Sequence, residues 1–252
     1  MVCRDGADGD VVAEDVWAAV ASAYDVFAVP HEPARRAALD ELVPLLRPDC
    51  GPILDVGAGS GASVAVVLDR LPTASVVALE PSRAMRSLLL SRIAARTAWF
   101  PRVTVRPEDF FSATLPPRLG GAILLGVVGC FDAGERAAVL AELATRLPAG
   151  GAALMDLRLP LRPQRVVPRE RSVAMLGGLE YREIAEAWPC GTEGMRWRVS
   201  YLCLEGERIL TEDTVEFDMR HPVPRVVAAE ASRVGLTLRP LPGRSHWMLE
   251  RP

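Results

Sequence analysis

A glycine-rich loop between a short apolar run and a helical stretch constrains this chain more than any other feature. The apolar run covers residues 53–56, and a helix-like stretch follows over 62–71. The loop between them contains Gly57, Gly59 and Gly61. Glycine lets the backbone turn sharply and approach a ligand closely because it has no Cβ. Free N–H groups at the start of the next helix add hydrogen-bond donors. The segment therefore predicts a strand–loop–helix unit that holds a ligand.

Apolar runs and helix-like stretches alternate on the C-terminal side of this loop. Further strands are expected at 75–79, 103–105, 122–128 and 152–157. Helices are expected between them at 82–95 and 133–147. Short continuous apolar strands that alternate with helices are typical of a parallel sheet buried on both faces. The sequence therefore predicts an α/β fold with a doubly wound, mostly parallel sheet.

The N-terminal segment and the region after the fifth strand have a different texture. An amphipathic helix is expected over 11–27 and a second helix over 33–46, with Pro30 and Pro33 breaking the first. Residues 159–168 are rich in proline and are expected to form a loop. Polar–apolar alternation predicts antiparallel strands at 180–188, 195–205 and 208–220. The core is expected to resume with a helix at 224–234 and strands at 236–239 and 245–250.

The chain is therefore expected to contain three parts. N-terminal lid helices would occupy residues 1–38, and the α/β core would occupy 39–160 and 221–252. A β insertion over 161–220 would cover the active site.

Two acidic residues at the ends of the first two strands indicate the ligand. Glu80 ends the second strand, where a carboxylate can accept hydrogen bonds from a ribose diol. Asp55 would repel a pyrophosphate but can pair with the ammonium of an amino-acid tail. The loop also fits the loose G-x-G-x-x-A pattern of dinucleotide folds, so a nicotinamide-dependent oxidoreductase stays open. Asp55 favours S-adenosylmethionine over a dinucleotide.

Four segments, in this order, resemble motifs of the class I S-adenosylmethionine-dependent methyltransferases of small molecules. They are 55–61 (DVGAGSG), 79–85 (LEPSRAM), 107–110 (PEDF) and 147–151 (LPAGG). The resemblance covers about 39–156 and, more loosely, the end of the chain. It implies a Rossmann-like, doubly wound, mostly parallel sheet with helices on both faces, plus an antiparallel β insertion over the active site.

The resemblance also implies the residues of the cofactor site. Asp55 would hold the methionine end, Glu80 the ribose hydroxyls and Asp109 the adenine amino group. The complete implied set is Tyr24, Asp55, Gly57, Ala58, Gly59, Glu80, Pro81, Asp109, Phe110 and Val127. The chain departs from many relatives at Gly121, where they carry an acid, and at 129–131 (GCF), where they are rich in histidine. No metal is expected.

Methyl transfer from a sulfonium is an in-line displacement that mainly requires alignment and exclusion of water. A general base is needed only when the nucleophile arrives protonated. His221 and Tyr24 are the catalytic candidates, although a packing role is the alternative for each. The candidates for acceptor binding are His31, Cys130, Phe131, Arg158, Trp188, Trp197 and Tyr201. Arg158 could bind an anionic acceptor, and the aromatic residues could instead form the core of the insertion.

Composition excludes several other classes of protein. A net charge of −3 argues against a protein that coats nucleic acid through charge alone. No apolar run reaches the length of about 18 residues that a membrane-spanning helix needs. The chain contains no lysine, which excludes Schiff-base and P-loop chemistry. The five cysteines contain no C-x-x-C pair, so neither a disulfide framework nor a zinc site is expected.

The expected function is methyl transfer from S-adenosylmethionine to a small-molecule acceptor in specialised-metabolite biosynthesis. A peptide or protein methyltransferase and a catalytically silent cofactor-binding subunit are the alternatives. The acidic, polar start of the chain favours the cytoplasm. No nucleic acid or membrane partner is expected, and the oligomeric state is a monomer or a homodimer.

Overall fold

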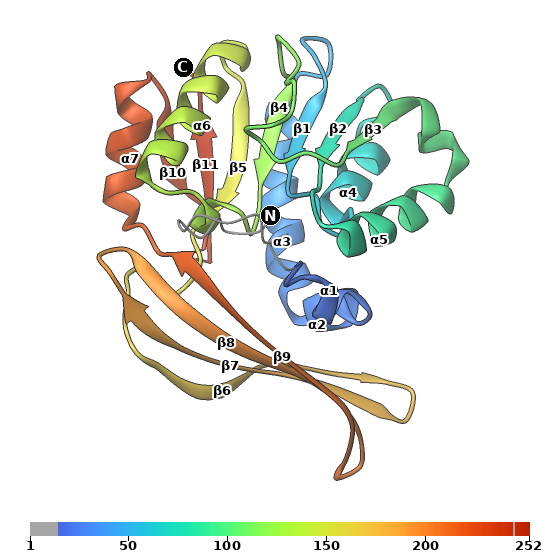
Figure 1. Cartoon of the computed structure of the whole chain (residues 1–252). Helices are drawn as coiled ribbons and strands as arrows, with labels where there is room; N and C mark the ends of the chain where they lie inside the picture. The colour runs from blue at the N-terminus through green and yellow to red at the C-terminus, as the bar shows by residue number, and fades with distance from the viewer. Residues whose placement is uncertain (1–14, 244) are drawn as a thin grey trace.

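The computed structural model describes residues 15–243 and 245–252, and they form two β-sheets with helices around the larger one. Figure 1 shows the seven-stranded sheet flanked by helices on both sides, with the long four-stranded sheet below them. Within the described residues, no helix is long and apolar enough to cross a membrane.

The larger sheet has the strand order β10-β11-β5-β4-β1-β2-β3. Strands β1 to β5 pair in parallel, β11 runs antiparallel to β5, and β10 runs antiparallel to β11. The strands are β1 (Ile53–Val56), β2 (Val76–Leu79), β3 (Val103–Arg106), β4 (Gly121–Leu124), β5 (Ala152–Asp156), β10 (Thr237–Pro240) and β11 (His246–Glu250). This arrangement confirms the predicted fold class. The strand expected at 122–128 ends earlier, at Leu124, and Gly126 has a positive φ of 76°.

Helices cover both faces of this sheet because successive strand residues point to opposite sides. Ile53 packs in the apolar cluster beneath α3, α4 and α5, whereas its neighbour Leu54 packs in the cluster beneath α6 and α7. The helices are α3 (Glu32–Leu42), α4 (Ala62–Arg70), α5 (Arg83–Ala94), α6 (Ala133–Arg146) and α7 (Pro224–Arg233). Asp132 and Glu135 form the capping box that starts α6, as their spacing predicts. Short 3-10 helices lie at η3 (Thr97–Arg102) and η4 (Val128–Cys130).

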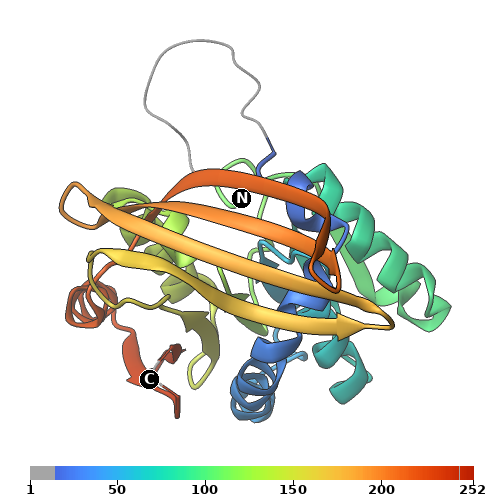
Figure 2. The same ribbon diagram turned by 90° about the horizontal axis from the view of Figure 1, so that it is seen from below.

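The smaller sheet is an antiparallel meander with the order β6-β7-β8-β9. Its strands are β6 (Val166–Leu176), β7 (Leu179–Cys190), β8 (Gly194–Glu205) and β9 (Arg208–Arg220). Figure 2, seen from below, shows the sheet lying across the core. The last three strands match the sequence prediction, whereas β6 was not predicted and begins inside the expected loop. Two register shifts in its pairing with β7 interrupt the alternation that would reveal a strand.

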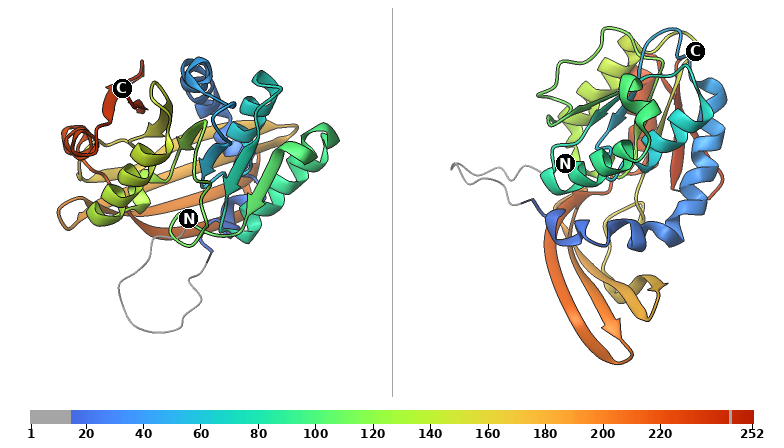
Figure 3. Two further views of the ribbon diagram at one scale, coloured as in Figure 1. Left: turned by 90° about the horizontal axis from the view of Figure 1, so that it is seen from above. Right: turned by 90° about the vertical axis from the view of Figure 1, so that its right-hand side faces the viewer.

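The short helices α1 (Ala18–Ala21) and α2 (Tyr24–Ala28) lie between the two sheets (Figure 3). The 3-10 turn η1 (Val29–His31) leads from them into α3, which packs on the larger sheet and is followed by η2 (Val43–Leu45). The single helix expected over 11–27 is wrong, because two short helices occupy its described part, and residues 11–14 lie outside the described residues. Pro30 and Pro33 do not break the helical path. Each lies in a first turn, where a missing N–H leaves no bond unmade.

Candidate cofactor and acceptor site

The glycine loop leaves the carboxyl end of β1 and turns into α4 at the centre of the parallel sheet. Gly57, Gly59 and Gly61 have φ values of 65°, 58° and 81°, a region that side-chain-bearing residues rarely adopt. A Cβ on Gly57 would collide with Cγ1 of Val127. At Gly59 the nearest atom to an added Cβ is Met85 Cε at 3.6 Å, so this part of the loop is less crowded. The two positions require glycine for different reasons: Gly57 for space and φ, Gly59 for φ alone.

Glu80, which directly follows β2, holds the glycine loop in place by a hydrogen bond. Its side chain is only 2% exposed. One carboxylate oxygen accepts a hydrogen bond from the N–H of Gly59 at 2.8 Å, and the other accepts from the N–H of Ser82 at 2.9 Å. Each oxygen retains a further lone pair that a ribose hydroxyl could use. Glu80 therefore fixes the shape of the loop in addition to the sugar contact that its position implies.

Asp55 places a buried carboxylate oxygen without a hydrogen-bond partner at the end of β1. It is 3% exposed, and its Oδ2 forms no hydrogen bond with any described residue. Burial raises the pKa of this carboxyl to about 7, although Arg35 acts in the opposite direction. A buried acceptor without a partner is costly. The ammonium of an amino-acid tail would supply the missing donor and a countercharge, so the site fits S-adenosylmethionine.

Helix α2, which was predicted to belong to a lid, contacts the glycine loop directly. The carboxylate of Asp25 accepts a hydrogen bond from Ser60 Oγ at 2.6 Å and pairs with Arg92 of α5 at 2.5 Å. The Nε–H of Arg92 donates to the carbonyl of Ser60 at 2.7 Å. Tyr24 lies beside this contact, with its hydroxyl 3.8 Å from where a Cβ on Gly59 would stand, and burial raises its pKa. The structure thus places Tyr24 at the loop, as expected, and adds Asp25 and Arg92, whose roles were not predicted.

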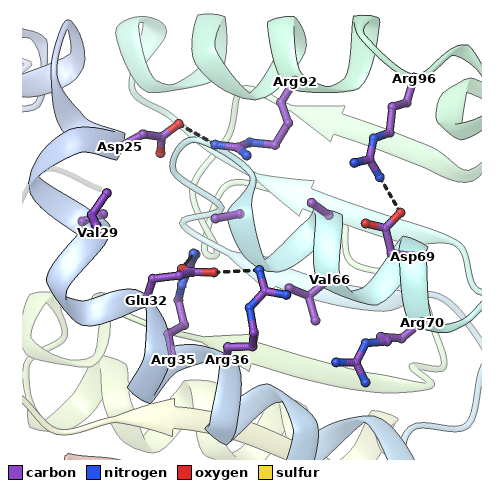
Figure 4. A pocket seen from close by; sticks show the side chains of 13 residues that line it. Asp25, Val29, Glu32, Arg35, Arg36, Val66, Asp69, Arg70, Arg92 and Arg96 are labelled. Atoms are coloured by element: carbon purple, nitrogen blue, oxygen red, sulfur yellow. Dashed lines mark hydrogen bonds and ion pairs between the residues drawn. The ribbon is translucent and has the colours of Figure 1, made fainter. Parts of the chain in front are cut away.

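A pocket of about 400 Å³ opens on the outer side of this contact (Figure 4). Arginines and acids dominate its lining. Its ion pairs are Arg35–Glu32, Arg36–Glu32, Arg92–Asp25 and Arg96–Asp69, and Arg70 pairs with Asp40 just outside. Asp55 and Glu80 are not among its lining residues. This pocket is therefore a salt-bridged groove beside the lid, separate from the predicted cofactor residues.

The loops after β3 and β4 complete the cofactor side. Asp109 Oδ1 accepts hydrogen bonds from the N–H groups of Phe111 and Ser112 at 2.9 and 2.8 Å, which fixes the loop after β3. The rings of Phe110, Phe111 and Phe131 pack edge to face, with centroids 5.5 to 6.5 Å apart. Val127, after β4, reaches Gly57. Ala58 is buried in the loop, and Pro81 directly follows Glu80. The loops after β1 to β4 thus converge at the carboxyl edge of the sheet, where ligands bind in such folds.

His221 does not occupy the predicted position of a general base. It is 2% exposed, and both of its ring nitrogens are engaged. Nε2 accepts a hydrogen bond from the indole N–H of Trp197 at 3.0 Å, which requires Nδ1 to carry the proton. Nδ1 then donates to the carbonyl oxygen of Pro160 at 2.8 Å. Burial also lowers the pKa of His221. The residue is a neutral structural link between the two sheets.

The two tryptophans predicted for acceptor binding lie on opposite faces of the smaller sheet. Trp197 pairs with Ala187 across β7 and β8 and is buried on the face toward the core. Trp188 pairs with Arg196 and therefore points the other way. Its ring lies between the guanidinium groups of Arg165 and Arg198, at 5.8 and 5.7 Å. The predicted acceptor role of Trp188 is wrong, because its face of the sheet is turned away from the core.

The remaining acceptor candidates lie on α2's neighbours, on the smaller sheet and after β5. Tyr201 packs against Phe27 of α2, with ring centroids 5.1 Å apart, and burial raises its pKa. Cys130 is buried in the apolar cluster between η4 and the smaller sheet. His31 is exposed at the end of η1, and burial of its ring together with Arg171 lowers its pKa. Arg158, just after β5, is partly buried beside Gly126.

Comparison with known proteins supports a methyltransferase. Residues 53–151 match the family model of a methyltransferase domain. No curated protein matches the sequence. Among solved structures, Streptomyces venezuelae DesVI is similar with a TM-score of 0.72 and 18% identity, covering 91% of this chain and 97% of that one. CalS10, an amino pentose methyltransferase from Micromonospora echinaspora with bound S-adenosylmethionine, has a TM-score of 0.68 and 21% identity, covering 88% and 91%.

The sugar N-methyltransferase KedS8 from Streptoalloteichus is similar over the whole chain. Its TM-score is 0.66 with 21% identity, and the match covers 100% of this chain and 98% of that one. These likenesses concern the fold. Residues 53–151 match a methyltransferase domain, and the chain as a whole has the fold of these solved methyltransferases.

Proposed function

We propose that this enzyme methylates an amine on a small-molecule acceptor of specialised metabolism. The observation that carries the proposal is helix α2, which contacts two parts of the chain. Its Asp25 accepts a hydrogen bond from Ser60 of the glycine loop, and its Phe27 packs against Tyr201 on the inner face of the smaller sheet. A helix and a sheet placed below the strand ends in this way suit a compact acceptor better than a folded protein.

In this proposal, the cofactor is bound by Asp55, Glu80, Asp109 and the glycine loop. The neighbouring residues of the predicted set complete the site: Tyr24, Pro81, Phe110 and Val127. Asp55 would pair with the ammonium of the cofactor, and Glu80 would hold the ribose. S-adenosylmethionine supplies a methyl group already activated on a sulfonium. Residues of the lid and the smaller sheet exclude water and align the acceptor, which is the main contribution that a displacement of this kind needs.

Both ring nitrogens of His221 are hydrogen-bonded, so His221 is not available as a base, and this favours an amine as the nucleophile. A free amine has its own lone pair and needs no base before attack, whereas an alcohol must lose a proton. The nitrogen lone pair forms the bond to the methyl carbon while the carbon–sulfur bond breaks, and its electron pair stays on sulfur. The ammonium product then releases a proton to water. His221, with both nitrogens hydrogen-bonded, takes no part in this sequence.

The similar structures support the same class of acceptor. CalS10 is described as an amino pentose methyltransferase involved in calicheamicin biosynthesis, and KedS8 as a sugar N-methyltransferase. By analogy, we propose an amino sugar as the acceptor and biosynthesis of a specialised metabolite as the setting. The peptide alternative and the catalytically silent alternative become outcomes of the test below.

Two measurements test the proposal. Calorimetry with S-adenosylhomocysteine should show one site per chain, and NAD should not bind. Methyl transfer from labelled S-adenosylmethionine should then be measured on amino sugars and on their N-acetylated counterparts, which lack the nucleophilic amine. Transfer should occur only to the free amines. Absence of cofactor binding, transfer to peptides instead, or no transfer at all would each contradict the proposal.

A further inference from the structure

Asp15, which lies just before the first helix, is hydrogen-bonded to the start of α5. The hydroxyl of Ser82 donates to Oδ2 of Asp15 at 2.7 Å. The same hydroxyl accepts from the N–H of Met85 at 3.1 Å and so caps α5. The N–H of Ser82 donates to Glu80, the carboxylate that also accepts from the glycine loop. A short chain of hydrogen bonds therefore joins Asp15 to the residue proposed to bind the ribose.

The other oxygen of the Asp15 carboxylate has no partner. Oδ1 is buried and accepts no hydrogen bond from residues 15–243 and 245–252. The bond from Ser82 to Oδ2 ties the carboxylate to α5. A carboxylate can accept at both oxygens, and a buried acceptor without a donor costs free energy. Asp15 therefore holds an unused acceptor beside the proposed ribose contact.

Trp17, two residues further along the chain, has an unused group of the opposite kind. Its indole N–H is buried and donates to no acceptor within the described part of the chain, although a buried indole normally finds one. Its ring packs against Phe217 of β9, with centroids 6.2 Å apart. Helix α1, which begins directly after Trp17, contacts both α5 and β9 (Figure 1). The unused donor thus lies on the same short segment as the unused acceptor of Asp15.

We propose that Asp15 and Trp17, together with Glu80, form a clamp on the ribose of S-adenosylmethionine. The inference rests on the proposed function, since it adds two contacts to the same cofactor. A simple anion would satisfy only the indole N–H, and a simple cation only the carboxylate. A ribose diol satisfies both, because each hydroxyl donates and accepts. One hydroxyl donates to Glu80 and the other to Oδ1 of Asp15, while the indole N–H donates to an oxygen of the diol.

Trp17→Phe tests the donor, because it keeps an aromatic ring against Phe217 and removes the N–H. Calorimetry should show binding of S-adenosylhomocysteine weakened by about fivefold, as for the loss of one hydrogen bond. Trp247→Phe is the matched control. Trp247 also has a buried indole N–H without a partner, but it lies on β11 and packs against the cluster beneath α6 and α7. Because the two variants lose the same atoms, S-adenosylhomocysteine should raise the unfolding temperature of Trp247→Phe as it does for the wild type, and that of Trp17→Phe by less.

Asp15→Asn tests the acceptor. The amide keeps an oxygen for Ser82 and places an NH₂ group where the unused carboxylate oxygen stood. The probes are S-adenosylhomocysteine and its 2′-deoxy and 3′-deoxy forms. In the wild type, the loss of either hydroxyl should weaken binding by about tenfold. In Asp15→Asn, one of the two penalties should shrink to about twofold, whereas the other, which belongs to Glu80, should remain. Asp69→Asn is the control, since Asp69 pairs with Arg96 in the outer groove.

The outcomes separate the clamp from the proposed function. Weaker binding in Trp17→Phe and Asp15→Asn, one reduced deoxy penalty and unchanged controls support the clamp. Equal deoxy penalties in the wild type and Asp15→Asn, or equal losses of affinity in Trp17→Phe and Trp247→Phe, overturn it while cofactor binding stands. A Trp17→Phe variant that is less stable without ligand than Trp247→Phe, yet binds normally, shows a structural role and also overturns it. If S-adenosylhomocysteine did not bind the wild type, the proposed function would fail together with the clamp.

Discussion

Two regions, the candidate cofactor side around the glycine loop and the candidate acceptor side on the inner face of the smaller sheet, differ in how their buried polar groups are satisfied. On the cofactor side, Oδ2 of the buried Asp55 has no hydrogen-bond partner among the described residues. On the acceptor side, His221 is hydrogen-bonded at both ring nitrogens, to Trp197 and to Pro160. The first region therefore has a polar group left for a ligand, whereas this part of the second is closed by contacts within the protein.

The two sides also differ in how the chain builds them. The cofactor side is made by successive strand ends and the loops that follow them, so most of its contacts join neighbouring parallel strands. The acceptor side joins α2, β6, β8 and the start of the segment after β9. Trp197 of β8 is linked through His221 to the backbone carbonyl of Pro160, which follows β5 of the larger sheet. Local sequence patterns therefore describe the first side better than the second.

The largest expected effect comes from removing the brace of the cofactor side. Glu80→Ala leaves the N–H groups of Gly59 and Ser82 without their charged acceptor and also removes the proposed ribose contact. We expect affinity for S-adenosylhomocysteine to fall by roughly 100-fold, about 3 kcal/mol, measured by calorimetry. Glu108→Ala is the control, since its carboxylate pairs with Arg106 only two residues away. Equal losses in the two variants would contradict the assigned role.

Asp55→Asn should act in opposite directions on stability and on binding. The folded pKa of about 7 lies above the ordinary value of 3.8, so ionising Asp55 costs the folded state stability as pH rises from about 4 to 7. At pH 8 the variant should be more stable by about 2 kcal/mol, an advantage that disappears near pH 3. Its affinity for S-adenosylhomocysteine should fall by about tenfold.

Denaturant unfolding at the two pH values, with calorimetry at pH 8, provides the measurement. Asp49→Asn serves as the control, because Asp49 is exposed and lies before β1. A variant that is less stable at pH 8, or that binds the cofactor product as well as the wild type, would show that Asp55 is not the strained ammonium partner.

A pair of glycine variants separates backbone strain from crowding in the cofactor side. Gly57 and Gly150 have similar φ values of 65° and 71°, but only Gly57 has atoms within 4 Å of an added Cβ. Gly150→Ala should lose about 1 kcal/mol from φ alone. Gly57→Ala should lose about 1.5 kcal/mol more, because the methyl group meets Val127. Equal losses in thermal or denaturant unfolding would mean that Val127 moves aside freely.

The smallest expected effect concerns the contact between the lid and the loop. Asp25 and Arg92 are both partly or largely exposed, so their ion pair is well screened. A double-mutant cycle with Asp25→Ala and Arg92→Ala should give a coupling free energy of about 0.5 kcal/mol in unfolding. A coupling free energy that grows on addition of S-adenosylhomocysteine would link the lid to the cofactor side. A value of zero under both conditions would remove that link.

Much of the core could be predicted because its signals are local. The apolar runs at β1, β2 and β5, the capping residues of α6 and the glycine loop all act within a few residues of chain. The fold class followed from these. The positions around the loop, such as Asp55 and Glu80, were accessible because strand ends in a parallel sheet converge.

The rest depended on contacts that no local pattern contains. Two register shifts in the pairing of β6 with β7 interrupt the polar–apolar alternation by which a strand is predicted. Pro30 and Pro33 were predicted to end a helix, although each lies in a first helical turn, where proline is tolerated. His221 was predicted to be a base, but its Nε2 accepts a hydrogen bond from Trp197, which is on another strand. Trp188 and Trp197 are both aromatic residues of one insertion, and only the pairing of β7 with β8 shows that they face opposite ways.

Helix α2 is hydrogen-bonded both to the glycine loop and to strand β6. Asp25 accepts from Ser60 of the glycine loop at 2.6 Å, and the carbonyl of Phe27, two residues on, accepts from Ser172 of β6 at 2.9 Å. An outward movement of this short helix must break both bonds together. The two reactants would then enter, and the two products leave, through a single shared gate.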